Sequence, residues 1–218
     1  MGWAHTLLPS DGMTADYPVR VEITSPTRFD RVQLALRIVL SIVLGWIGIT
    51  AGWLVCALFG VLPVFAAIAI STKTSKRFTD DIAPRTWRVL EWLLQLWAYM
   101  ALLVDELPTG GDHPVRVSIR FTGTPTVGSA LWRLVTSIPS GLVLGALWIV
   151  SGVFWLIAAI AVLFGWAVPA SILAFQGGVL RWQARLVAYH ASLVEEYPPF
   201  SFDTGTGHDQ PLSTAGAR

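Results

Sequence analysis

The sequence predicts an all-α integral membrane protein with a small β element, built as a tandem duplication of one unit. Three observations predict this fold class. Hydrophobic residues make up 54% of the 218 residues and charged residues only 13%, against roughly 25% charged residues in typical soluble domains. The charged residues leave two long gaps, and the two halves of the chain repeat each other.

The two uncharged stretches predict the membrane spans. No charged residue lies between Arg37 and Lys73, or between Arg133 and Arg181. As single helices these stretches would be roughly 50 and 70 Å long. A hydrocarbon core is only about 30 Å thick and takes about 20 residues per crossing. Each stretch is therefore predicted to form a transmembrane hairpin, over residues 34–71 and 131–175, which gives four spans.

The internal repeat sets the domain organisation. Residues 17–23 read Tyr-Pro-Val-Arg-Val-Glu-Ile, and residues 113–119 repeat them as His-Pro-Val-Arg-Val-Ser-Ile. Residues 89–108 align without a gap to residues 179–198, with 11 identical positions of 20. The predicted units are residues 17–111 and 112–202. A flexible N-terminal tail, residues 1–16, and a disordered C-terminal tail, residues 203–218, flank them.

Each unit is predicted to begin with a short strand and to end with a third helix. Apolar residues alternate with polar ones over 19–23 and 115–119, which is typical of a half-buried strand. The apolar hairpin follows the strand. The third helix is predicted over about residues 87–107 in the first unit and 178–197 in the second.

The third helix decides the number of spans. The second copy carries Arg181, Arg185 and His190, which are costly inside a membrane, whereas its Trp and Tyr residues suit the headgroup level. An amphipathic helix at the interface, or one partly buried against the bundle, is therefore favoured. A crossing third helix, with six spans in total, is the alternative. In the four-span arrangement nearly all charges and both termini share one side, which the positive-inside rule makes cytoplasmic.

The end of the second unit resembles a known family. Gly165-x3-Pro169-x5-Phe175-x2-Gly178-x2-Arg181-Trp182 is followed by Ala188-Tyr189 and by Tyr197-Pro-Pro-Phe-Ser201. This pattern resembles an uncharacterised bacterial membrane family, catalogued as domain of unknown function number 4389. The segments that start at Tyr17 and His113 resemble the family's start, so the resemblance covers residues 17–202 in two copies. It implies a location in the bacterial cytoplasmic membrane and no established activity.

Two departures from the family pattern stand out. The residues around Pro169 include no basic side chain, and the first unit ends in Leu107-Pro-Thr-Gly110 in place of the aromatic Pro-Pro-Phe ending. A role that depends on basic residues at the proline is therefore not expected of the second unit.

The candidate site residues fall into four groups. The candidates for binding lipid headgroups are Arg37, Arg133, Arg181 and Arg185. The candidates for ion pairs between strands and helix ends are Arg20, Arg116, Glu106 and Glu196. The glycines in small-x3-small patterns, which allow close helix packing, are Gly48, Gly52, Gly141 and Gly145. The aromatic residues matched between the units are Trp92, Trp182, Tyr99 and Tyr189.

The sequence contains no catalytic or metal-binding signature. None of its four histidines has a second ligand three or four residues on, and Cys56 is the only cysteine. A phosphate-binding glycine loop and a G-x-S-x-G nucleophile elbow are also missing. We therefore expect no enzyme activity, no metal and no cofactor. The net charge of +1 gives no reason to expect nucleic-acid binding.

Two functions remain open. The leading hypothesis is a non-enzymatic accessory or scaffold protein of the bacterial cytoplasmic membrane. It would bind lipid headgroups, a membrane-protein partner or a second copy of itself through its cytoplasmic face. The alternative is a lipid-handling or small-solute transport component that uses the groove between the two repeats, where binding sites of duplicated bundles often lie. A membrane enzyme using Asp80, Asp81 and His190 is the weakest hypothesis.

Overall fold

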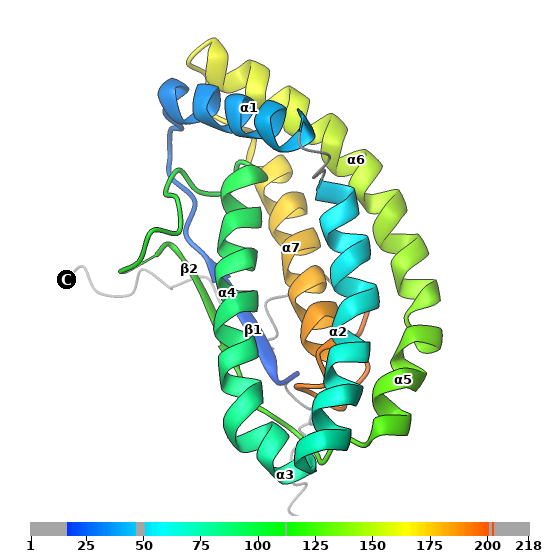
Figure 1. Ribbon diagram of the computed structural model, residues 1–218. Helices are drawn as coiled ribbons and strands as arrows, with labels where there is room; N and C mark the ends of the chain where they lie inside the picture. Colours follow the sequence, from blue (N-terminus) through cyan, green and yellow to red (C-terminus); the bar gives the residue numbers. More distant parts are fainter. Residues whose placement is uncertain (1–16, 47–50, 112, 201, 203–218) are drawn as a thin grey trace, which may run out of the picture.

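The structure is mostly helical, with one two-stranded sheet, and its layers surround one central helix. This computed structural model describes residues 17–46, 51–111, 113–200 and 202, and of residues 51–57 the backbone alone. The central helix is α7 (Ala170–His190). The sheet and α4 (Ala83–Met100) lie on one side of α7, and α2 (Ala51–Lys73) and α6 (Ile138–Leu163) on the other (Figure 1).

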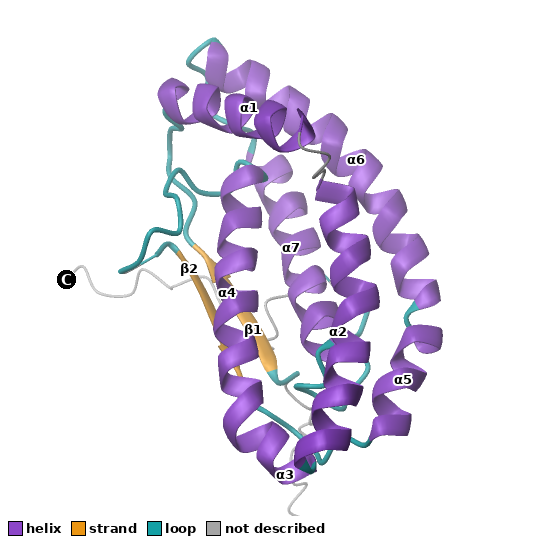
Figure 2. Ribbon diagram, viewed as in Figure 1, coloured by secondary structure: helices purple, strands orange, loops and turns teal. Residues whose placement is uncertain are grey.

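The two predicted strands are confirmed. β1 (Val19–Ile23) and β2 (Val115–Ile119) pair antiparallel about the central pair Val21 and Val117. The apolar residues at alternate positions point into the protein, and Arg20, Glu22, Arg116 and Ser118 are exposed. The strands run beside α4 along the length of the bundle (Figure 2), not at one end of it.

The predicted hairpins are not formed. α6 continues as one helix through Ser151 and Gly152, near the middle of the predicted hairpin 131–175, because glycine inside a helix costs only about 1 kcal/mol. α5 (Val127–Thr136) leads directly into α6, and Pro139 lies in the first turn of α6, where proline is tolerated. α1 (Arg31–Trp46) crosses the end of the bundle and is not antiparallel to α2 (Figure 1).

Four membrane spans are not supported either. In the described part of the chain, α6 alone is long and apolar enough to cross a membrane, with a mean hydropathy of 2.5 in an 18-residue window. Only 22% of that window is buried inside the protein. The apolar helix Leu58–Lys73, the described part of α2, is shorter than this criterion requires. The two tails lie outside the described residues.

The third helices begin and end before their predicted positions. A short helix α3 (Ser75–Arg77) and a π-helical turn η1 (Phe78–Ile82) lead into α4. α4 is amphipathic, with Leu90 and Leu94 buried and Val89 exposed. α7 is not interfacial, because every residue from 176 to 190 except Arg181 is buried. Gln176 and His190 of α7 form hydrogen bonds inside the protein, so the bundle can enclose these two polar side chains.

Candidate functional site

Arg37 forms a buried site at the end of α4. Its Nε donates a hydrogen bond to the Tyr99 carbonyl at 2.7 Å, and its Nη2 donates to the Val104 carbonyl. The same Nη2 lies 3.0 Å from Asp105 Oδ1. The guanidinium carbon is 4.2 Å from the centre of the Tyr99 ring, and the Arg37 side chain is fully buried. The positive charge therefore meets the carbonyl end of α4, where the helix dipole favours a cation.

Arg133 forms a second site of the same construction at the end of α7. Its Nη1 donates to the Tyr189 carbonyl and, at 2.6 Å, to the Val194 carbonyl. The guanidinium carbon is 4.4 Å from the centre of the Tyr189 ring, and Arg133 is buried. Burial lowers the pKa of this guanidinium, with Tyr189 and Glu195 acting in the opposite direction.

Both helices end in the same backbone conformation. The first residue beyond each helix end with a positive φ is Leu102 after α4 and Ser192 after α7, each at 58°. In each case the next amide donates back to a carbonyl five residues earlier, Leu103 to Ala98 and Leu193 to Ala188, both at 3.0 Å. This bond pattern ends a helix sharply. It also exposes the carbonyls that the two arginines bind.

The lipid-headgroup prediction is wrong for Arg37 and Arg133. Their guanidinium groups are buried, and their bonds go to protein carbonyls. Arg185 is also buried, with its guanidinium carbon 5.7 Å from the centre of the Tyr17 ring. Arg181 is partly exposed and donates to the Val21 carbonyl of β1 at 3.3 Å. The sequence alignment matched Arg37 with Arg133. It did not show that each arginine packs against the ring of a matched tyrosine, Tyr99 or Tyr189.

Among the ion-pair candidates, Glu196 holds the clearest contacts. Its Oε2 accepts a hydrogen bond from the Thr122 hydroxyl at 2.6 Å, and its carbonyl accepts one from the Tyr17 hydroxyl at 3.1 Å. Burial raises the pKa of Glu196, but the Thr122 bond, backbone bonds and the charge of Arg120 together hold that pKa below its ordinary value. Glu106 accepts a bond from His113 through its carbonyl. Arg20 and Arg116 are exposed on the sheet and have polar or electrostatic contacts.

The two glycines whose surroundings are described do not pack helices within this protein, and packing against a partner helix stays a prediction. A Cβ added at Gly141 or Gly145 would meet nothing within 4 Å, so neither glycine permits a close helix approach inside this protein. Both are exposed on α6. Gly48 lies outside the described residues, and the surroundings of Gly52 are not described.

The matched tryptophans differ in their surroundings. Trp92 is 47% exposed, and its Nε1 donates to the Pro108 carbonyl at 2.8 Å. Trp182 is buried beside Phe200, at 5.2 Å between ring centres, and its Nε1 has no partner among the described residues. The two positions are therefore matched in sequence but not in environment.

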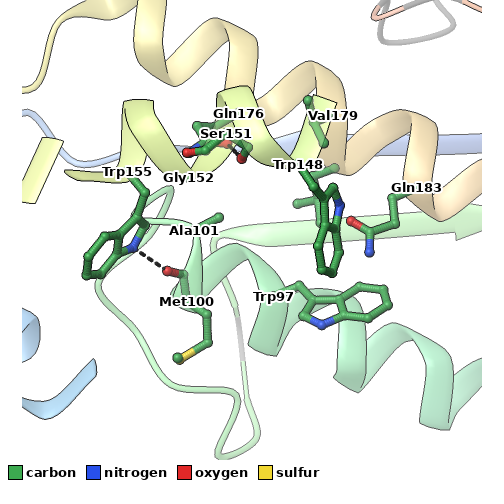
Figure 3. A pocket seen from close by; sticks show the side chains of 11 residues that line it. Trp97, Met100, Ala101, Trp148, Ser151, Gly152, Trp155, Gln176, Val179 and Gln183 are labelled. Atoms are coloured by element: carbon green, nitrogen blue, oxygen red, sulfur yellow. Dashed lines mark hydrogen bonds between the residues drawn. The ribbon is translucent and has the colours of Figure 1, made fainter. Parts of the chain in front are cut away.

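A pocket of about 210 Å³ lies between α4, α6 and α7. In Figure 3 its tryptophans lie at two ends, Trp97 and Trp148 near Gln183, and Trp155 near Met100. The Trp155 Nε1 donates to the Met100 carbonyl at 2.8 Å. Sequence reasoning expected a groove between the repeats but did not find these residues. The two glutamines of α7, Gln176 and Gln183, were the available signal.

The comparison with known families gives one match. Residues 128–201 match the family model described as Domain of unknown function (DUF4389). The matched residues include most of α5 and all of α6 and α7. The match is a single copy, so the predicted resemblance of residues 17–111 is not supported by it. No curated protein and no solved structure matches the chain.

Proposed function

We propose that this chain is a non-enzymatic accessory protein of a membrane, which places one apolar side in lipid and binds a protein partner through its sheet. The observation that carries the proposal is the separation of apolar and charged residues onto different sides of one bundle. It deepens the leading sequence hypothesis by assigning each side a role.

The lipid face is formed by the exposed apolar side chains of α1, α2, α5 and α6. Ile149, Leu142 and Ile42 are 75%, 73% and 62% exposed, and most other exposed large apolar residues lie on the same four helices. Soluble monomers rarely expose a continuous apolar surface of more than a few hundred Å². A surface that extends over four helices is therefore better suited to lipid than to water.

The strand face is formed by Arg20, Glu22, Arg116 and Ser118, which are exposed on the sheet. α7 packs against β1 on one side and α6 on the other, so the strand face lies across α7 from α6, at the same level along the bundle. If α6 crosses the membrane, these charged groups reach the same depth. Each charge facing lipid at the bilayer centre would cost about 2.5–3.5 kcal/mol. A protein partner, or a second copy, that covers the strand face removes this cost.

The basic residues favour one orientation. Lys73, Lys76 and Arg77 are exposed at the α3 end of the bundle (Figure 1). Arg31 begins α1 at the opposite end, so the basic residues are not all on one side as predicted. By the positive-inside rule we place the α3 end in the bacterial cytoplasm.

We also infer that the fold is made of two copies of one unit. The two arginine sites support this, because the matched residues Arg37 and Arg133 bind the matched ends of α4 and α7. The strand pairing supports it too, because Val21 faces its own counterpart Val117. With α4 and α7 running in opposite directions, the two copies would be inverted relative to each other (Figure 1).

Site-specific photocrosslinking in native membranes tests the proposed function. A photoreactive residue is placed at Ser118 on the strand face and, as the matched control, at Ile149 on the lipid face. We expect a discrete protein adduct from position 118 and lipid adducts from position 149. Mass spectrometry of the adduct separates a partner from a second copy. Protein adducts from position 149 and none from position 118 would contradict the proposal, as would recovery of the chain in the soluble fraction.

A second candidate function, lipid or small-solute handling, is favoured by the pocket between α4, α6 and α7. α4 belongs to the first predicted unit and α6 and α7 to the second, so the pocket lies where the sequence hypothesis expected a groove.

A further inference from the structure

We propose that the pocket between α4, α6 and α7 binds a neutral, apolar molecule through one carbonyl oxygen, to which Trp97 and Gln183 donate hydrogen bonds. The inference rests on the second candidate function and names the chemistry of its ligand.

Two donors in the pocket wall have no partner among the described residues. The Trp97 Nε1 and the Gln183 Nε2 are buried without a hydrogen bond, and the two residues are only 8% and 4% exposed. A buried donor without an acceptor is unfavourable, so such groups are uncommon in folded proteins. Both groups can only donate from these atoms. A ligand that satisfies them must therefore present an acceptor.

Three other polar residues of the pocket are bonded within the protein. The Trp155 Nε1 donates to the Met100 carbonyl (Figure 3), and Gln176 and Ser151 bond to each other. The buried donors that lack a partner among the described residues belong to Trp97 and Gln183, which Figure 3 shows at the same end of the pocket. An acceptor oxygen bound at that end is the partner that we assign to both.

The walls select a neutral and apolar ligand. No charged residue lines the pocket, and its surface is mostly aromatic and aliphatic. An ion placed there would lose its hydration without an opposite charge. An apolar cavity of about 150 Å³ is enough to hold benzene, so a pocket of about 210 Å³ has room for one ring with a small substituent, or a short acyl segment.

A carbonyl of this kind has two sources in a membrane. One is the acyl ester of a glycerolipid, and the other is a ring ketone carried on a membrane-soluble molecule. The shared chemistry is an acceptor oxygen next to an apolar group. Two small probes, methyl hexanoate for the ester and acetophenone for the ring ketone, distinguish the sources.

The test uses the full chain in detergent, with the tryptophan indoles labelled with ¹⁵N. Acetophenone is compared with isopropenylbenzene, which has the same shape but carries a methylene group in place of the carbonyl oxygen. We expect a saturable shift of the Trp97 indole N–H resonance with acetophenone or methyl hexanoate, and no such shift with isopropenylbenzene. Trp97→Phe assigns the resonance. Trp92, on the same helix but already bonded to Pro108, is the internal control.

Variants make the prediction quantitative. Gln183→Leu keeps the side-chain size and removes one donor, so affinity for the carbonyl probe should fall about 3- to 10-fold. Trp92→Phe should leave that affinity unchanged. Whichever carbonyl probe binds more tightly identifies the source. Equal binding of isopropenylbenzene, an equal shift of the Trp92 resonance, or no saturable shift would overturn the inference.

The titration is independent of the membrane position, because it is carried out in detergent. Native mass spectrometry of the same sample detects lipid that stays bound during purification. A retained lipid together with no carbonyl selectivity would overturn the ligand class proposed here and leave lipid handling standing. Absence of both would overturn lipid handling as well.

Discussion

Replacing Arg37 with methionine should destabilise the fold by about 3–5 kcal/mol. Methionine fills most of the same volume but removes the bonds to the Tyr99 and Val104 carbonyls. Hydrogen bonds from a charged donor contribute about 1.5–3 kcal/mol each. Asp105 would also lose its cationic partner at 3.0 Å, but its side chain is 20% exposed and stays solvated, so the two hydrogen bonds carry the estimate.

The assay is thermal unfolding of the full chain in a mild detergent, followed by circular dichroism. For a chain of this length, 3–5 kcal/mol corresponds to a fall in Tm of roughly 6–20 °C. The Tm of Arg37→Lys should lie between those of the unchanged protein and Arg37→Met. Lysine keeps the positive charge, but one ammonium group cannot reproduce the guanidinium geometry. Arg28→Ala is the control, since Arg28 is exposed in the loop before α1. A change for Arg37→Met as small as that of the control would refute the assigned role.

Three further predictions follow from the helix ends, the lipid face and Glu196. Ser192→Gly should raise stability by about 1 kcal/mol, because Ser192 has a positive φ and a buried hydroxyl without a partner; Leu102→Gly should lower it, because Leu102 is 1% exposed. Gly145→Ala should leave unfolding unchanged or raise the Tm slightly, because nothing lies within 4 Å, whereas a marked fall would restore the packing role predicted from sequence. The pKa of Glu196, followed by NMR, should rise in Thr122→Val. Because its folded-state pKa is depressed, Glu196 stabilises the fold above the ordinary carboxyl pKa, and this contribution should be lost as the pH falls through the acidic range. If acid lowers the Tm of Glu196→Gln as much as that of the unchanged protein, this role of Glu196 is contradicted.

The local elements could be predicted because short-range patterns determine them. Alternation at Val19, Val21 and Ile23 identified β1, and its copy identified β2. Gap-free alignment matched Tyr99 with Tyr189, and the carbonyl of each accepts a hydrogen bond from the matched arginine, from Nε of Arg37 and from Nη1 of Arg133. In these cases the residues themselves carry the structural information.

The long-range arrangement could not be read from the same patterns. An uncharged stretch of a given length can form two short helices or one long helix. Residues 131–175 were therefore predicted to form a hairpin, although α6 continues unbroken from Ile138 to Leu163. The polar residues of α7 indicated a helix at the interface or partly buried against the bundle, and its central position was not predicted, because the sequence does not show which groups Gln176 and His190 meet. Whether a polar residue is enclosed depends on contacts made by distant segments.

Spin-label accessibility along α6 tests the central claim most directly. Cys56 is first replaced by serine so that a single engineered cysteine carries the label. Labels at the exposed positions Ile149, Val153 and Ile160 are compared with a label at the buried position Leu144, in native-like bilayers. The account predicts high oxygen accessibility and low accessibility to a water-soluble nickel complex at the three exposed positions, and low accessibility to both at position 144. High accessibility to the nickel complex at the exposed positions would show that this face lies in water, and would contradict the account.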